Sequence, residues 1–107
     1  MIDAAVTMRY ANGMTYRDAI LSAAMDLARK DGWPNGITRD KVAAVAGVGT
    51  GTVNWVFGTV GKLRDEVMRN AIDREEWEIV AQGLANGSDV AKSAPREIQV
   101  KALASLI

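Results

Sequence analysis

Few side chains in this sequence are able to do acid–base, nucleophilic or metal chemistry. The chain has neither histidine nor cysteine, so the commonest general base and metal ligand are missing, and thiolates and disulfides are excluded. A catalytic site would have to be built from carboxylates, lysines and hydroxyls alone. Thr59 is better interpreted as a helix cap than as a nucleophile, because no base accompanies it. We therefore expect a binding protein rather than an enzyme, with no cofactor and no metal site.

The polar side chains best suited to binding lie in a stretch that carries no charge. Residues 42–61 contain no Asp, Glu, Lys or Arg, yet they include Thr50, Thr52 and Asn54. Asparagine can pair with adenine through two hydrogen bonds, and a threonine methyl can contact thymine. These side chains are therefore able to contact base edges.

Twenty uncharged residues also have the length of a membrane span. Five glycines interrupt the stretch and favour two short helices with turns: Gly47, Gly49, Gly51, Gly58 and Gly61. The first residues lack the basic and apolar regions of a secretory signal. We expect no membrane segment and a cytoplasmic protein.

Three positions in and beside this stretch have the spacing of a helix-turn-helix at about residues 38–57. Ala43 is small enough for two helices to cross there, Gly47 tolerates the positive φ of the turn, and Val53 would pack back onto the first helix. Two short helices joined by three or four residues can seat the second one in the major groove of DNA. A helical hairpin with no role in DNA binding remains the alternative.

Helical periodicity and capping residues predict an all-α protein with no strand. The expected helices are a short one at Asp3–Arg9, one from Thr15 to Gly32, one capped by Thr38, one at Thr50–Phe57, a long fourth helix from Val60 to Ala85, and a short C-terminal helix from about Pro95. Thr15 and Asp18 have the arrangement of a capping box. We expect an N-terminal extension at 1–14, a three-helix DNA-binding domain at 15–72, and a helical C-terminal extension at 73–107 that serves dimerisation.

Charge is spread unevenly along the chain, although the formal net charge is zero. Residues 1–72 carry nine Lys or Arg against seven Asp or Glu, and residues 73–107 carry four against six, which gives +2 and −2. A basic patch is the usual footprint of a nucleic-acid binder, and here it is faint. Positive charge around the uncharged helix would have to come from Arg17, Arg39, Lys41, Lys62 and Arg64.

The same region matches a family pattern in order and spacing. The match begins with Arg17-Asp18-Ala19-Ile20-Leu21-Ser22-Ala23-Ala24, continues through Leu27 to Gly32-Trp33, and resumes at Thr38, Val42-Ala43, Ala46-Gly47-Val48, Gly51-Thr52-Val53, Phe57 and Lys62-Leu63. With one extra residue in the 33–37 loop, residues 17–72 resemble the N-terminal domain of TetR-family repressors. The resemblance covers about half of the chain.

The resemblance implies a homodimer that places its third helix in successive major grooves of a near-palindromic operator. By position, Thr38 would contact a phosphate and Lys62 would lie near the DNA backbone. The residues that the resemblance places at DNA are Thr38, Arg39, Thr50, Gly51, Thr52, Asn54, Trp55 and Lys62. Ala43, Gly47 and Val53 would hold the motif together.

Several positions depart from the family pattern and leave the recognition helix uncharged. The usual Ser-Lys is Gly49-Thr50 here, and the usual Tyr is Asn54. The basic or His positions that follow are Trp55 and Val56, the Pro after Phe is Gly58, and the Lys two residues later is Val60. Since phosphate neutralisation supplies most non-specific affinity, we expect weak binding outside the operator. Trp55 is either a groove residue or an aromatic of the core or an interface.

The second half of the chain is shorter than the resemblance would suggest. Family members carry a C-terminal ligand-binding and dimerising domain, whereas 35 residues follow position 72 here. These are too few to enclose a drug-sized cavity of roughly 300 Å³ or more, so we expect no full-size ligand-binding domain and no small-molecule inducer. We expect dimerisation through the apolar residues Trp77, Val80, Leu84 and Leu103.

The resemblance therefore implies a sequence-specific, double-stranded DNA-binding transcriptional regulator, most simply a repressor. Two alternatives stay open. One is a DNA-binding adaptor in packaging or partition that uses the same motif. The other is a helical protein-interaction factor without DNA binding, which the uncharged helix and the zero net charge would suit.

Overall fold

Seven helices make up the part of the chain that the structure, a computed structural model, describes. The described residues are 15–107, and they contain no strand. The helices are α2 (Tyr16–Asp31), α3 (Arg39–Ala46), α4 (Thr50–Phe57), α5 (Val60–Asp73), α6 (Trp77–Ala85), α7 (Asp89–Lys92) and α8 (Arg96–Ala104). The predicted all-α class is confirmed. The helix expected at Asp3–Arg9, and with it the extension at 1–14, lies outside the described residues.

Threonine caps begin three of the helices. At α2 the Thr15 hydroxyl accepts from the Asp18 N–H at 3.1 Å, and the Asp18 carboxylate accepts from the Thr15 N–H at 3.3 Å, so the predicted capping box is present. Thr38 and Thr59 accept from the N–H groups of Lys41 and Lys62, at 3.2 and 3.1 Å. Each hydroxyl satisfies a backbone donor that the first helical turn leaves unpaired.

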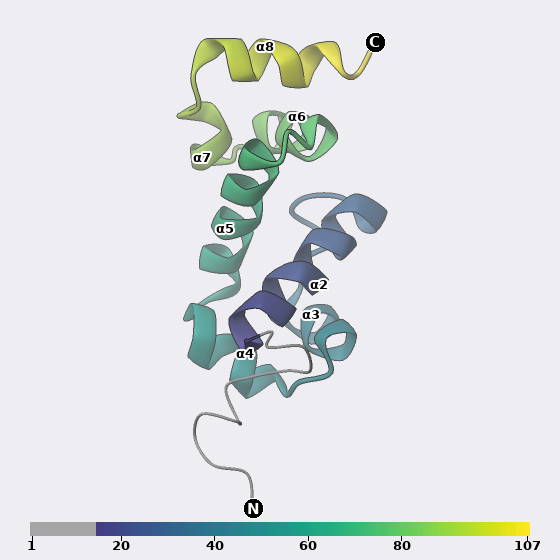
Figure 1. Cartoon of the computed structure of the whole chain (residues 1–107), viewed down its shortest axis with the longest axis vertical. Coiled ribbons are helices and arrows are strands. Elements are labelled where there is room, and N and C mark those ends of the chain that lie inside the picture. Colours follow the sequence, from purple (N-terminus) through teal and green to yellow (C-terminus); the bar gives the residue numbers. More distant parts are fainter. Residues whose placement is uncertain (1–14) are drawn as a thin grey trace, which may run out of the picture.

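The helices form an elongated body whose two ends are built differently (Figure 1). α2 and α5 pack against each other along the middle, α3 and α4 lie at one end, and α6, α7 and α8 lie at the other. The body measures 52 × 23 × 21 Å. α4 and α8 are therefore at opposite ends of the long axis. Among residues 15–107, no helix combines the length and the apolar character needed to span a bilayer.

A single hydrophobic core runs through this body and takes side chains from every helix. Ile20 of α2, Leu63 of α5 and Val80 of α6 are fully buried, and each such side chain stabilises the fold by about 1.5–3 kcal/mol. α6 comes very close to its neighbours at Gly83, where a Cβ would overlap the Met68 side chain and lie 3.1 Å from the Cβ of Ala91. Residues after 73 are thus part of the same packed unit as those before.

The expected long helix from Val60 to Ala85 is wrong, because the chain turns sharply between α5 and α6. Glu75 has φ 58°, and the Glu76 N–H donates to the Ala71 carbonyl at 2.9 Å, as in a Schellman motif. A non-glycine residue in this conformation costs about 1–2 kcal/mol. The turn brings Ile79 and Val80 into the core, 2% and 0% exposed, which a straight helix could not do.

The turn also changes the expected dimer residues. Val80 is a core residue of its own subunit, so the prediction that it forms a dimer surface is wrong. Trp77 and Leu84 are half-buried against the core, while Leu103 on α8 is 51% exposed. A further helix, α7, was not expected. Its N-cap is Ser88, whose hydroxyl accepts from the Ala91 N–H at 3.1 Å.

Candidate nucleic-acid interface

A three-residue turn joins α3 to α4 at the tip of the molecule. Gly47 has φ 73° and ψ 33°, and the N–H of Val48 donates to the Ala43 carbonyl at 3.0 Å. A Cβ at Gly47 would meet no atom within 4 Å, so it is the backbone conformation, and not space, that favours glycine. The positive φ predicted for Gly47 is confirmed.

The two other residues predicted to hold this element together are buried at the helix crossing. Ala43 is 4% and Val53 is 2% exposed. Val53 and Phe57, four residues apart on α4, face the core together. Because a helix advances 100° per residue, this inward pair fixes which side chains of α4 point outward.

The outward face of α4 carries Gly51 and Trp55, four residues apart and opposite the buried pair. Trp55 is 69% exposed, so it is not a core aromatic of this chain. Thr50 is exposed, whereas Thr52 and Asn54 are half-buried on the two flanks of the helix. None of the described residues of α4 carries a charge.

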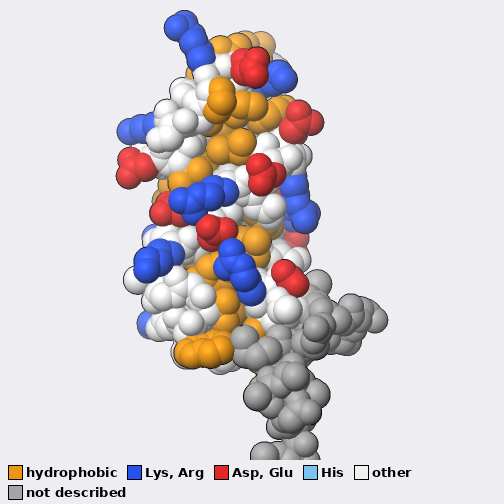
Figure 2. Space-filling view, turned by 60° about the vertical axis from the view of Figure 1, so that its left-hand side comes forward, with side chains coloured by type: hydrophobic (Ala, Val, Ile, Leu, Met, Phe, Trp, Pro, Cys, Tyr) orange, Lys and Arg blue, Asp and Glu red, His pale blue; other side chains and the backbone are white. Residues whose placement is uncertain are grey.

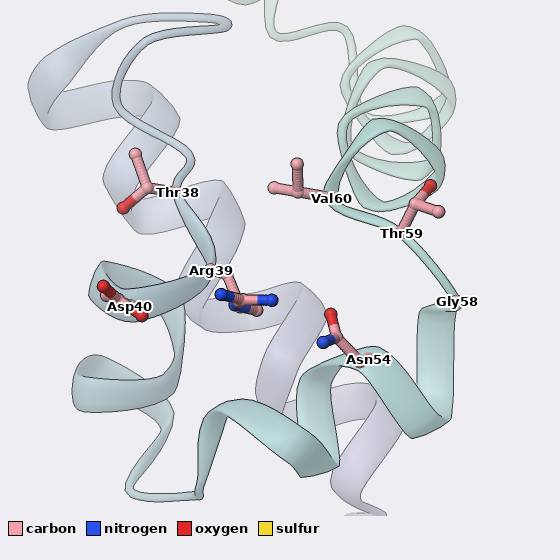
Figure 3. A pocket seen from close by; sticks show the side chains of 7 residues that line it. All are labelled: Thr38, Arg39, Asp40, Asn54, Gly58, Thr59 and Val60. Carbon is pink, nitrogen blue, oxygen red and sulfur yellow. The ribbon is translucent and has the colours of Figure 1, made fainter.

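The flank that carries Asn54 borders an open groove of about 470 Å³. Figure 3 shows the Asn54 amide pointing into the space between Arg39 at the start of α3 and Val60 at the start of α5. The lining residues are Thr38, Arg39, Asp40, Asn54, Gly58, Thr59 and Val60. Two helix N-termini therefore open onto one groove, and their free N–H groups give it a partial positive charge that favours anions.

The cations around this groove are fewer than the sequence suggests. Arg17 stacks 4.7 Å from the centroid of the Phe57 ring and pairs with Glu66 at 3.0 Å. The guanidinium of Arg64 is bonded to a backbone carbonyl of the protein. Arg39 and Lys62 form no ion pair among the described residues, and Lys41 lies 4.0 Å from Asp31. Arg39 and Lys62 are thus the cations best placed to meet an incoming anion.

The face of the molecule that Figure 2 displays has no patch of charges of one sign. There, Lys and Arg side chains alternate with Asp and Glu side chains, and hydrophobic side chains reach the surface at both ends. On this face the positive side chains are interspersed with negative ones and do not form a basic patch.

The structure brings some of the predicted site residues together and separates others. Thr38, Arg39 and Asn54 share the groove, while Lys62 lines a neighbouring hollow with Arg17 and Phe57. Thr50, Gly51, Thr52 and Trp55 lie on other sides of α4. Asp40, Gly58, Thr59 and Val60 line the groove although they were not predicted as site residues. Thr59 was recognised as a cap, and pairing its helix start with that of Thr38 would have located the groove.

A bidentate ion pair lies away from the groove, where α2 meets α6. Arg29 Nε and Nη2 donate to the two carboxylate oxygens of Glu76 at 2.5 and 2.9 Å. These hydrogen bonds lower the pKa of Glu76 and raise that of Arg29, against an opposing effect of burial. Within residues 15–107, no cluster of three acidic side chains could hold a metal ion. The pair links the end of α2 to the start of α6.

A scan of family models and searches of curated proteins and of solved structures found no match to this chain.

Proposed function

We propose that this chain is a sequence-specific, double-stranded DNA-binding transcriptional regulator that acts as a homodimer on a near-palindromic operator. In this proposal α3, the turn at Gly47 and α4 are a helix-turn-helix, and α4 is the recognition helix. The observation that carries the proposal is the placement of α4: its outer face is exposed, and beside it the starts of α3 and α5 open onto one groove with Asn54 between them.

This geometry suits a duplex because the groups that would contact phosphates lie beside the groups that would contact bases. Phosphates would lie against the N–H groups and side chains of Thr38, Arg39 and Thr59, which fixes the orientation of the protein. Bases would then be contacted by the uncharged side chains of α4, where an asparagine amide can pair with adenine. Low positive charge means that affinity depends on base contacts more than in most DNA-binding proteins.

A second copy of the chain is the partner that this proposal requires. Half-sites lie about 34 Å apart on one face of the duplex, and each chain carries one recognition helix at one end. Val100 and Leu103 are 56% and 51% exposed on α8, while the opposite side of α8 packs on α6. We propose that α8 takes part in this contact with the two chains lying side by side, because an end-to-end pair of bodies 52 Å long would place the two α4 helices far more than about 34 Å apart.

The test of the function is selection of bound fragments from random duplex DNA at low salt. A symmetric motif with half-sites about ten base pairs apart supports a dimeric regulator. Long arrays with little sequence preference would instead indicate an adaptor for packaging or partition. The Leu103→Glu variant, measured by sedimentation equilibrium, should be monomeric and should lose the symmetric motif.

One observation favours a different function. Trp55 and Val45 are 69% and 54% exposed at the tip of the molecule, and exposed apolar side chains often mark protein interfaces. A helical protein-interaction factor would use this surface without DNA. No enrichment of any duplex in the selection experiment would favour that alternative.

A further inference from the structure

We propose that Arg64 is a positioning residue that fixes the start of α3 against the start of α5, and so sets the width of the groove. The sequence suggests a different role, in which Arg64 supplies positive charge to the DNA. The effect of Arg64 on DNA affinity rests on the proposed function, whereas its effect on the position of α3 is tested without DNA.

The guanidinium of Arg64 is turned toward the protein and not toward the groove. Its Nε and Nη2 both donate to the carbonyl oxygen of Ile37, at 3.1 and 2.8 Å, and the carbonyl of Arg64 accepts from the indole N–H of Trp33 at 3.1 Å. Ile37 is 0% exposed and Trp33 is 8% exposed. Arg64 therefore holds both ends of the segment that leads into α3.

Hydrogen bonds from α6 complete the attachment of this segment. The N–H of Trp33 donates to the side-chain oxygen of Gln82 at 2.7 Å. One helical turn after Gln82, the side chain of Asn86 donates to the Trp33 carbonyl at 3.2 Å. Ile37 is followed directly by Thr38, the N-cap of α3. The place where α3 begins is thus set by side chains of α5 and α6.

The packing of the helices explains why such a link is needed. α3 packs mainly on α2 and α4, whereas α5 packs on α2, α4, α6 and α7. In the described part of the chain, every hydrogen bond between residues 32–37 and α5 involves Arg64. A phosphate held between two helix N-termini is bound well only if both keep their separation, because hydrogen bonds weaken steeply with misplacement.

Replacing Arg64 with lysine distinguishes a phosphate contact from a positioning contact experimentally. A guanidinium reaches one carbonyl with two fixed N–H donors, while lysine offers a compact charge on a flexible stem. A phosphate contact would survive the Arg64→Lys change in large part. A positioning contact would not.

The experiment measures affinity against salt concentration for the duplex that the wild-type protein selects from random DNA. We expect Arg64→Lys and Arg64→Met each to lower affinity by about tenfold with the salt slope unchanged. Lys62→Met, the matched loss of a proposed phosphate contact, should reduce the slope by about one. Arg69→Met removes an exposed cation of the same helix, paired with Glu66, and should leave the affinity close to wild type.

Amide hydrogen exchange, measured without DNA, tests the structural part. In both Arg64 variants the N–H groups of Lys41 and Val42, which are bonded to Thr38, should exchange about tenfold faster, while amides within α6 keep their wild-type rates. Unchanged exchange at Lys41 and Val42 overturns the proposal. So does an Arg64→Lys variant with wild-type affinity beside an Arg64→Met variant whose salt slope has fallen by one. If the wild type binds no duplex at all, the proposed function fails, and the exchange rates alone decide whether Arg64 positions α3.

Discussion

The turns at Gly47 and at Glu75 each place a residue at positive φ, and they serve different purposes. The turn at Gly47 projects α4 outward, so that Trp55 is exposed and Asn54 borders an open groove. The turn at Glu75 folds α6 inward, so that Val80 becomes fully buried. In the first case a glycine takes the conformation without strain. In the second a glutamate takes it, and the burial that follows offsets the cost.

The first turn exposes the surface that we propose contacts DNA, whereas the second turn completes the hydrophobic core. The first turn depends on a local residue and leaves its helix with few contacts beyond α2, α3 and α5. The second depends on tertiary contacts, among them the Arg29–Glu76 ion pair. Substitutions at either turn should therefore change stability, whereas only substitutions on or beside α4 should also change DNA affinity.

The largest effect is expected at the first turn. Gly47→Val should lower the free energy of unfolding by about 2–3 kcal/mol, because a β-branched residue resists positive φ. Chemical denaturation with urea measures this loss. Gly47→Asn should cost less, since asparagine tolerates the left-handed region, and Gly49→Ala, at φ −77° with open space around it, should cost little. Equal stabilities for Val and Asn at position 47 would mean that backbone strain does not govern this turn.

Next in size is the loss of a base contact on α4. Asn54→Ala should weaken binding to the selected duplex by about 1–3 kcal/mol and change the melting temperature little, because the amide makes no hydrogen bond within residues 15–107. Binding titrations and thermal melts of the same variant give both values. A variant that melts at a lower temperature but keeps its affinity and base preference would mean that Asn54 contributes to stability and not to base recognition.

At the second turn, Glu76→Gln should reduce stability by about 1 kcal/mol at neutral pH, a value limited by the exposure of Arg29. The pKa of Glu76 is lowered by its hydrogen bonds to Arg29, so its contribution is full above the ordinary glutamate pKa of 4.5 and disappears as the pH falls through the lowered value. Denaturation curves at several pH values should show the two proteins converging in acid. Glu78→Gln, at an exposed position of the same helix, is the control, and DNA affinity should not change.

The smallest expected effect is an increase in stability. Glu75→Gly should stabilise the fold by about 0.5–1 kcal/mol, since glycine adopts φ 58° without a Cβ penalty, while its greater freedom in the unfolded chain offsets part of the gain. Glu75→Ala keeps the strain and should stay within a few tenths of a kcal/mol of wild type. If the alanine variant gains as much as the glycine variant, the side chain of Glu75 and not its backbone is the source.

Local chemistry in the sequence was enough to predict the first turn and the helices around it. Thr15, Thr38 and Gly47 act within three or four residues of their own positions, so caps and a glycine turn could be located without knowing the fold. The predicted inward residues Ala43 and Val53 follow from helical spacing in the same way.

The second turn was not predicted, because no glycine or proline marks residues 74–76. Its one local signal is a change in the phase of the apolar positions, since on a straight helix Val80 would lie about 180° from Ala71. The bend is favoured only in the folded protein, where Arg29 of α2 pairs with Glu76 and the core buries Val80. The same reason explains Arg64, whose acceptor lies 27 residues away and whose charge alone suggested a surface role.

The attachment of Trp33 to α6 has a consequence for cutting the molecule into pieces. A fragment that stops at residue 72 would lack Gln82 and Asn86, the acceptor and the donor that satisfy the buried backbone of Trp33. Unpaired buried polar groups cost about 1–3 kcal/mol each, and the fragment would also uncover the apolar surface under α6. We expect that the shortest self-sufficient unit extends at least through Asn86, so that the element proposed to meet DNA owes its shape to residues encoded well downstream of it.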